Sequence, residues 1–162
     1  MLGFGKKKLL IDDAVAVASP VAGRLLALDE VPDPVISRGM MGPGFAVDPE
    51  SGRFCSPVDG TIVLIAKAAH AVGIRTANGA VIMLHAGLGS VSLCGEGIRC
   101  RLAEGERVIT GQPVLEVDLE LLRARVPSLI SPVIVANGDD YEVEGPFLDA
   151  VGSDPVVLVR RR

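Results

Sequence analysis

Two histidines, His70 and His85, are the only imidazoles in the chain and its best candidates for chemistry. His85 ends the apolar run in GAVIMLHAGLG (residues 79–89), and His70 lies among alanines in AAHA. Because strand side chains alternate between faces, His85 would either lie in the core or emerge at the end of its strand. Two neighbouring imidazoles can bind a metal, shuttle protons or carry a phosphoryl group. Their spacing alone does not choose among these roles.

The dipeptide Asn78-Gly79 lies between the two histidines and is the strongest turn signal in the sequence. Both residue types tolerate positive φ, which tight hairpin turns require. We therefore expect strands over 71–76 and 80–85 to form a hairpin. Such a hairpin would place His70 and His85 side by side on neighbouring strands.

Motifs of other common chemistries are missing from the sequence. It contains no GxSxG elbow, HExxH, Walker loop or GxGxxG, and Ser128 and Ser131 have no base nearby in sequence. A zinc hydrolase needs about three protein ligands, and the two histidines fall short of that number. Zinc bound in trans by His70, His85 and a partner's carboxylate stays open as an alternative. A biotinyl or lipoyl carrier would need a lysine at a tight β-turn, and we expect no such lysine in this sequence.

The composition predicts an all-β domain with an aliphatic core. Of the 162 residues, 49% are hydrophobic but only 3% are aromatic, so Val, Leu, Ile and Ala must fill the interior. With 19 glycines and 11 prolines the chain can turn often, as a β-sandwich or barrel requires. Ser-Pro-Val recurs at 19–21, 56–58 and 131–133, which indicates a reused β-unit. We expect one domain over 15–162 behind a flexible tail over 1–14.

The charge and the cysteines limit the partners. A net charge of −4 provides no basic stripe for a phosphate backbone, so we expect no nucleic-acid partner. No apolar run reaches the roughly 18–20 residues of a membrane span, and we expect a cytoplasmic protein. The lysines in MLGFGKKKLL would give at most weak contact with a membrane surface. Cys55, Cys94 and Cys100 lack CxxC spacing, which predicts reduced, mostly buried thiols. Nothing in the sequence indicates a cofactor.

Apolar runs between turn signals locate the remaining elements. We expect strands over 25–28, 44–47, 62–66, 71–76, 80–85, 107–109, 113–117, 134–135 and 156–159. One short helix is expected after Asp118, which would act as its N-cap, and Pro127 would follow its end.

Seven sequence blocks together resemble a known family. They are VPDPV (31–35), GPGFAV (42–47), SPVDG (56–60), HA (70–71), LHAGL (84–88), GEG (95–97) and DLELL (118–122). In this order they resemble the glucose-type IIA component of the bacterial phosphoenolpyruvate:sugar phosphotransferase system. The resemblance covers residues 15–160. It implies an antiparallel β-sandwich of the duplicated hybrid-motif type with one or two short helices.

The resemblance also implies a function, that of a phosphotransferase component. His85 would accept a phosphoryl group on Nε2 from the phosphocarrier protein HPr and pass it to a cysteine on the IIB domain of a sugar permease. His70 would hydrogen-bond the phosphate without carrying it. Gly87 and Val91 would support the site, and the Gly87 carbonyl is expected to accept the Nδ1 proton of His85, fixing the tautomer. Exposed backbone N–H groups could also stabilise the phosphate.

An apolar rim is expected to surround this site, where a docked partner would exclude water. Its expected members are Phe45, Val47, Ala86 and Leu88.

Three positions depart from the family pattern. Pro43 and Gly89 stand where better-known members carry acidic residues, and Ala68 stands in place of a threonine. These differences leave two interpretations open. The chain is a working IIA whose partner surface has diverged, or a regulatory paralogue that binds permeases or other proteins and is phosphorylated slowly or not at all.

Overall fold

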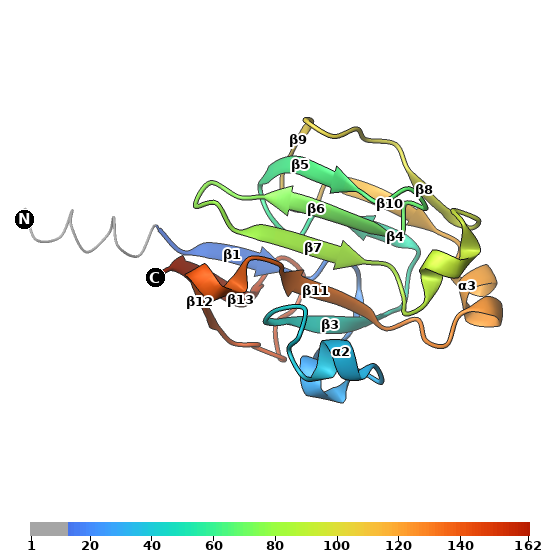
Figure 1. Cartoon of the computed structure of the whole chain (residues 1–162), viewed down its shortest axis with the longest axis horizontal. Helices are drawn as coiled ribbons and strands as arrows, with labels where there is room; N and C mark the ends of the chain where they lie inside the picture. The colour runs from blue at the N-terminus through green and yellow to red at the C-terminus, as the bar shows by residue number, and fades with distance from the viewer. Residues whose placement is uncertain (1–12) are drawn as a thin grey trace, which may run out of the picture.

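The computed structural model describes residues 13–162, and its strands form three antiparallel sheets (Figure 1). The largest has the order β2-β3-β11-β7-β6-β5-β9, and the two smaller sheets have the orders β4-β10-β8 and β1-β13-β12. Every pair of neighbouring strands is antiparallel. This confirms the expected all-β sandwich.

The elements follow one another along the chain with short connections. The strands are β1 (Val15–Ala18), β2 (Gly23–Ala27), β3 (Gly44–Pro49), β4 (Arg53–Cys55), β5 (Gly60–Ile65), β6 (Ala71–Arg75), β7 (Val81–His85), β8 (Ile98–Cys100), β9 (Arg107–Val108), β10 (Pro113–Val117), β11 (Ser131–Val135), β12 (Tyr141–Glu144) and β13 (Pro155–Arg161). The helical segments are η1 (Leu28–Glu30), α2 (Pro34–Ser37), η2 (Ser90–Leu93), α3 (Leu119–Arg125) and η3 (Gly138–Asp140).

The expected hairpin is present as β6 and β7, with Ala71 opposite His85. The turn closes through Gly79 N donating to Thr76 O at 3.0 Å. Of the two residues, Gly79 adopts a positive φ (89°) and Asn78 does not. Asn78 contributes differently: its side-chain oxygen accepts from the Thr76 hydroxyl at 2.8 Å. The loop is therefore longer than a two-residue turn, with a single left-handed residue at its end.

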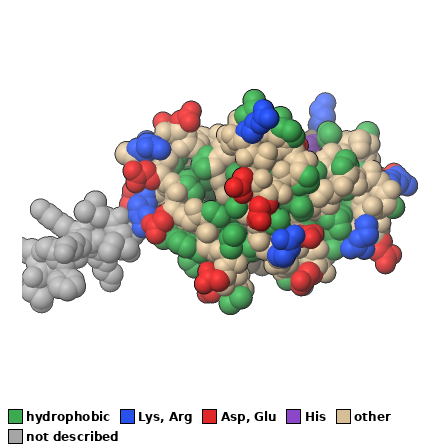
Figure 2. Space-filling model, turned by 90° about the horizontal axis from the view of Figure 1, so that it is seen from below, with side chains coloured by type: hydrophobic (Ala, Val, Ile, Leu, Met, Phe, Trp, Pro, Cys, Tyr) green, Lys and Arg blue, Asp and Glu red, His purple; other side chains and the backbone are tan. Residues whose placement is uncertain are grey.

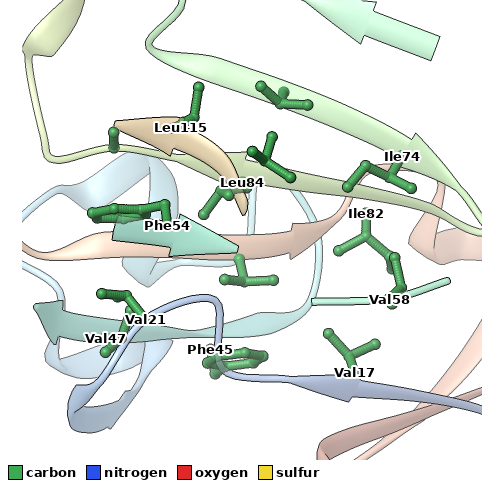
Figure 3. Packing of buried hydrophobic residues seen from close by; sticks show 14 of the residues in the cluster. Val17, Val21, Phe45, Val47, Phe54, Val58, Ile74, Ile82, Leu84 and Leu115 are labelled. Atoms are coloured by element: carbon green, nitrogen blue, oxygen red, sulfur yellow. The ribbon is translucent and has the colours of Figure 1, made fainter. Parts of the chain in front are cut away.

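The core lies between the sheets and is aliphatic, as the composition predicts. Figure 3 shows side chains from several strands meeting there, among them Phe45, Phe54, Leu84 and Leu115. Along β7 the side chains alternate: Ile82 and Leu84 are fully buried, and the residues between and beside them are partly exposed. This alternation directs His85 away from the core face, which answers the question raised by its place in the sequence.

The repeated Ser-Pro-Val motif forms a local two-fold arrangement. Each of the first two serine hydroxyls donates to a carbonyl two residues ahead, Ser19 to Val21 at 2.7 Å and Ser56 to Val58 at 2.6 Å. The residue before each serine donates its N–H to the proline carbonyl of the other repeat, at 2.9 and 2.7 Å. The two copies thus hold each other, as expected of a duplicated unit. The third copy, at Ser131, has different partners and is considered with the site.

The helix predicted after Asp118 is α3, and the Asp118 carboxylate accepts from Leu121 N at 3.1 Å. The short helix α2 was not predicted, although Asp33 caps it and Pro34 occupies its first turn. The short strands β1, β4, β8 and β12 were not predicted either. None of the described helices is both long and apolar enough to cross a membrane.

Two further expectations need comment. The cysteines are unpaired, but they are not mostly buried, because Cys94 is exposed and the other two are half-buried. The expected tail falls almost wholly on residues 1–12, outside the described residues. Asp13, which was assigned to that tail, accepts a hydrogen bond on its carbonyl from the Asn78 side chain at 3.1 Å. On one face of the molecule, charges of both signs are interspersed with apolar side chains (Figure 2).

Candidate functional site

The two histidines meet where β6 begins and β7 ends. His85 is the last residue of β7 and lies opposite Ala71, and His70, one residue before β6, lies opposite Ala86, whose N–H donates to the His70 carbonyl. Burial lowers the pKa of His85 below its ordinary value of about 6.5, and the nearby His70 lowers it further. The His85 imidazole is therefore neutral at pH 7 and keeps a lone pair on one nitrogen.

The ring nitrogens carry unsatisfied hydrogen-bonding capacity. His70 Nδ1 and His85 Nε2 are both shielded from solvent and have no hydrogen-bond partner among residues 13–162. Buried polar atoms are normally paired, so unpaired ones need a functional or structural explanation. Two such atoms on neighbouring imidazoles mark the place where a polar group from a partner or ligand could be received.

The backbone after His85 is held at three consecutive N–H groups. Ala86 N donates to the carbonyl of His70 at 2.9 Å, and Leu88 N donates to that of Ser128 at 2.9 Å. Between them, Gly87 N donates to the Ser131 hydroxyl at 3.0 Å. These three groups are committed, so they are not among the exposed N–H groups expected to stabilise a phosphate. Nor is the expected bond from His85 Nδ1 to the Gly87 carbonyl among the hydrogen bonds of the described residues.

A strained turn precedes His70. Ala69 has a φ of 57°, in the left-handed region that side chains other than glycine and asparagine seldom adopt. Ala69 N donates to Ala66 O at 2.8 Å, and Ala66 N donates to Ala71 O at 2.9 Å, which closes the turn over 66–71. The turn therefore sets the position from which His70 faces His85.

The expected apolar rim was wrong for all four of its members. Phe45, Val47 and Ala86 are 0% exposed and Leu88 is 7% exposed. Phe45 and Val47 lie on β3, which pairs with β2 on one side and β11 on the other and is covered on both faces. Ala86 and Leu88 each belong to one of the two hydrophobic clusters. These residues form the core beneath the site and cannot contact a docked partner from there.

Other apolar side chains around the site are exposed. Val91, which was expected to support the site, lies on η2 just after Leu88 and is 59% exposed. The α2 segment, residues 31–41, contributes Val31 and Ile36 to a second hydrophobic cluster that includes Leu88. It exposes Val35, Met40 and Met41 to solvent. The accessible apolar surface beside the histidines therefore comes from η2 and the α2 segment.

A metal centre built by this chain alone has no support in the described residues. Within 13–162, no group of three or more His, Cys, Asp or Glu side chains is arranged to hold an ion. Pro43 and Gly89 also place no carboxylate beside the imidazoles.

A β-sandwich that sets a neutral imidazole beside a second histidine, on a surface with exposed apolar side chains, has the features of a phosphohistidine carrier domain. Comparison with known proteins agrees. Residues 15–141 match the family model of the phosphoenolpyruvate-dependent sugar phosphotransferase system, EIIA 1. The chain belongs to this family.

Its relatives include both free-standing and fused proteins. The chain is 39% identical over 142 residues to a protein of Bacillus cereus named PTS system glucose-specific EIIA component, covering 88% of this chain and 84% of that protein. It is 36% identical to the PTS system mannose-specific EIIBCA component of Corynebacterium glutamicum, covering 94% of this chain but only 22% of that protein. The solved structure of glucose permease IIA from Mycoplasma capricolum aligns with a TM-score of 0.84 at 36% identity, over 90% of this chain and 95% of that one.

Proposed function

We propose that His85 carries a phosphoryl group between HPr and the IIB domain of a sugar permease. The N–P bond of phospho-HPr breaks as the Nε2–P bond of His85 forms, and the group then moves to a cysteine thiolate of IIB. The observation that carries this proposal is the neutral His85 imidazole with an unpartnered Nε2 beside His70. A neutral imidazole is the nucleophilic form, so burial prepares His85 for attack at pH 7.

His70 is the group best placed to stabilise the transferred phosphate. Its Nδ1 is unpartnered, and its backbone carbonyl is tied to Ala86 N at 2.9 Å, which fixes its distance from His85. Phosphoryl transfer depends mainly on alignment and charge stabilisation, which a fixed donor provides. Because the N–H groups of residues 86–88 are committed, they leave this role to His70 and to donors elsewhere around the site.

The partners follow from the relatives and from the exposed surface. In the fused relative, the name EIIBCA joins IIB and IIA in one chain, which supports a IIB domain as acceptor. Val91, Val35, Met40 and Met41 would contact the partner and exclude water from the phosphohistidine. We place the reaction in the cytoplasm, where unpaired thiols such as those of this chain are stable.

Intact mass spectrometry tests the proposal after incubation with phosphoenolpyruvate, enzyme I and HPr. We expect one acid-labile phosphoryl adduct on the wild-type chain and none on His85→Ala. We expect His70→Ala to accept the group but to transfer it slowly to IIB. Equal phosphorylation of the His85→Ala variant would disprove the assignment of the carrier.

One observation favours a second candidate. Nε2 of His85 is shielded from solvent, so a phosphoryl donor can reach it only after a local rearrangement. A regulatory paralogue that binds permeases or other proteins, and accepts phosphate slowly or not at all, would have such a shielded nitrogen. Absence of an adduct with the cognate HPr and a folded protein would favour this candidate.

A further inference from the structure

We propose that Ser131 is a positioning residue for His85. Its hydroxyl holds the backbone that leaves His85 and thereby sets the direction of the imidazole. The inference rests on the proposed function for its kinetic consequence, although its structural consequence can be measured without phosphoryl transfer. The hydrogen bonds of the Ser131 hydroxyl in the described structure go to Gly87 N and the Leu129 carbonyl and not to an imidazole, so it acts through the chain and not on the phosphate.

The position of Ser131 explains why a side chain is needed there. Ser131 begins β11, whose ladder with β7 runs from Val135 to Val133, opposite Leu84. In this register Pro132 would come next to His85, and proline has no N–H with which to extend the ladder. Backbone pairing therefore stops just before the residue that carries the chemistry. The hydroxyl of Ser131 then supplies the next contact across this junction.

The hydroxyl is completely committed. Ser131 is 0% exposed, and its oxygen accepts from Gly87 N at 3.0 Å while donating to the Leu129 carbonyl at 2.9 Å. The donated bond fixes the rotation of the hydroxyl, so its lone pair is directed at Gly87. A fixed acceptor of this kind holds its donor in one place.

The three N–H groups after His85 differ in one useful respect. Ala86 N and Leu88 N donate to backbone carbonyls, which no substitution removes. Gly87 N donates to a side chain that comes from a segment 44 residues away. Gly87 also has a φ of 74° and begins the turn away from β7. Of the three acceptors, the Ser131 hydroxyl is therefore the one that belongs to a side chain. It holds the residue at which the turn begins, two residues beyond His85.

Removing the hydroxyl would leave a buried Gly87 N–H without an acceptor. Such a group costs free energy until the backbone moves to find water or another oxygen. Any such movement displaces His85 relative to His70. A displacement of about 1 Å in a reacting group can cost on the order of 100-fold in rate, so a small shift has a measurable consequence.

The test compares Ser131→Ala and Ser131→Thr with the matched control Ser56→Ala. Ser56 is also buried, at 1% exposure, and its hydroxyl also donates to a carbonyl two residues away, at Val58. It belongs to the second copy of the repeat, and its hydroxyl bonds to Val58 and not to the 86–88 backbone. The rate of phosphoryl acceptance from phospho-HPr is measured below the unfolding transition of every variant. The His85 imidazole signals are followed by NMR across its titration.

We expect Ser131→Ala to slow acceptance about 10- to 100-fold and to shift the His85 signals and titration midpoint. Ser131→Thr, which keeps the hydroxyl, and Ser56→Ala should stay near the wild type in both measurements. Wild-type behaviour of Ser131→Ala would overturn the proposal, as would an equal effect of Ser56→Ala. Should Ser131→Ala fail to fold, Ser131→Cys, with its weaker acceptor, should lie between serine and the expected loss, and wild-type behaviour of that variant would overturn the proposal.

The NMR measurement separates this inference from the proposed function. A wild-type chain that accepts no phosphoryl group contradicts the carrier function. The His85 signals of Ser131→Ala would still decide whether Ser131 sets the imidazole.

Discussion

The left-handed Ala69 gives the sharpest test of how the fold positions His70. We consider Ala69→Gly, because glycine adopts a φ of 57° without the clash that an alanine side chain makes. Ala77 offers a matched control: it is exposed in the β6–β7 turn and does not have a positive φ. Both substitutions remove one methyl group and add the same conformational freedom to the unfolded chain.

The magnitude follows from the difference between the two sites. Added freedom in the unfolded state lowers the free energy of unfolding by about 0.4–1 kcal/mol in both variants. At Ala69 the relief of left-handed strain returns roughly 1–2 kcal/mol. Ala69 is partly buried against the core, and the loss of its methyl offsets part of this gain. We therefore expect Ala77→Gly to destabilise the protein, and Ala69→Gly to be about 1 kcal/mol more stable than Ala77→Gly.

Urea unfolding followed by circular dichroism measures this difference, with thermal unfolding as a second probe. For a domain of this size, 1 kcal/mol corresponds to about 2–4 °C in Tm. If Ala69→Gly lost as much stability as Ala77→Gly, the left-handed backbone at Ala69 would store no strain, and the reasoning from its φ of 57° would be refuted.

Three further predictions concern stability. Burial, and to a smaller extent His70, lowers the pKa of His85, so the unfolded chain binds more protons than the folded one and the free energy of unfolding should fall as pH drops below about 6.5. Urea titrations should show a weaker pH dependence of stability in His85→Asn than in the wild type, and the same pH dependence in both would contradict this. Tyr141 is only 3% exposed, and its hydroxyl donates to the Asn78 carbonyl at 2.8 Å, so Tyr141→Phe should lower the free energy of unfolding by about 1–2 kcal/mol in thermal unfolding. An unchanged Tm would mean that water replaces this bond. Asp118→Ala removes the N-cap of α3 and should lower the free energy of unfolding by about 1 kcal/mol in urea, whereas Asp118→Asn should stay close to the wild type. Equal losses of stability in both variants would rule out the capping bond as the cause.

The elements predicted best from the sequence are those specified by local residues. Gly79 closes the hairpin between β6 and β7, and Asp118 caps α3, because a turn or a cap depends on a few neighbouring side chains. Because that hairpin brings the two histidines together, their proximity could also be predicted from the sequence. The Asp33-Pro34 signal for α2 had the same local character and was overlooked.

The parts that sequence could not supply depend on distant pairing. Phe45 and Val47 were expected in an exposed rim around the site, but β3 lies between β2 and β11, and β11 is far along the chain. In the sequence, Ser131 is recognisable only as part of the third Ser-Pro-Val motif. Its contact with Gly87, 44 residues away, could not be predicted from the motif. The committed N–H groups after His85 have the same origin. Such contacts are set by the global topology, which local patterns do not encode.

The pairing of β1 with β13 bears on how this domain can be tethered. Val15 lies opposite Val159, so the chain enters and leaves the sandwich side by side. Figure 1 shows β7 running away from the C-terminus toward α3, so His85 lies at the end of β7 that is remote from the C-terminus. A linker attached at either terminus would meet the domain at the end remote from the histidines. Under the proposed function, the same domain can work untethered or as one module of a longer polypeptide without any change around the histidines.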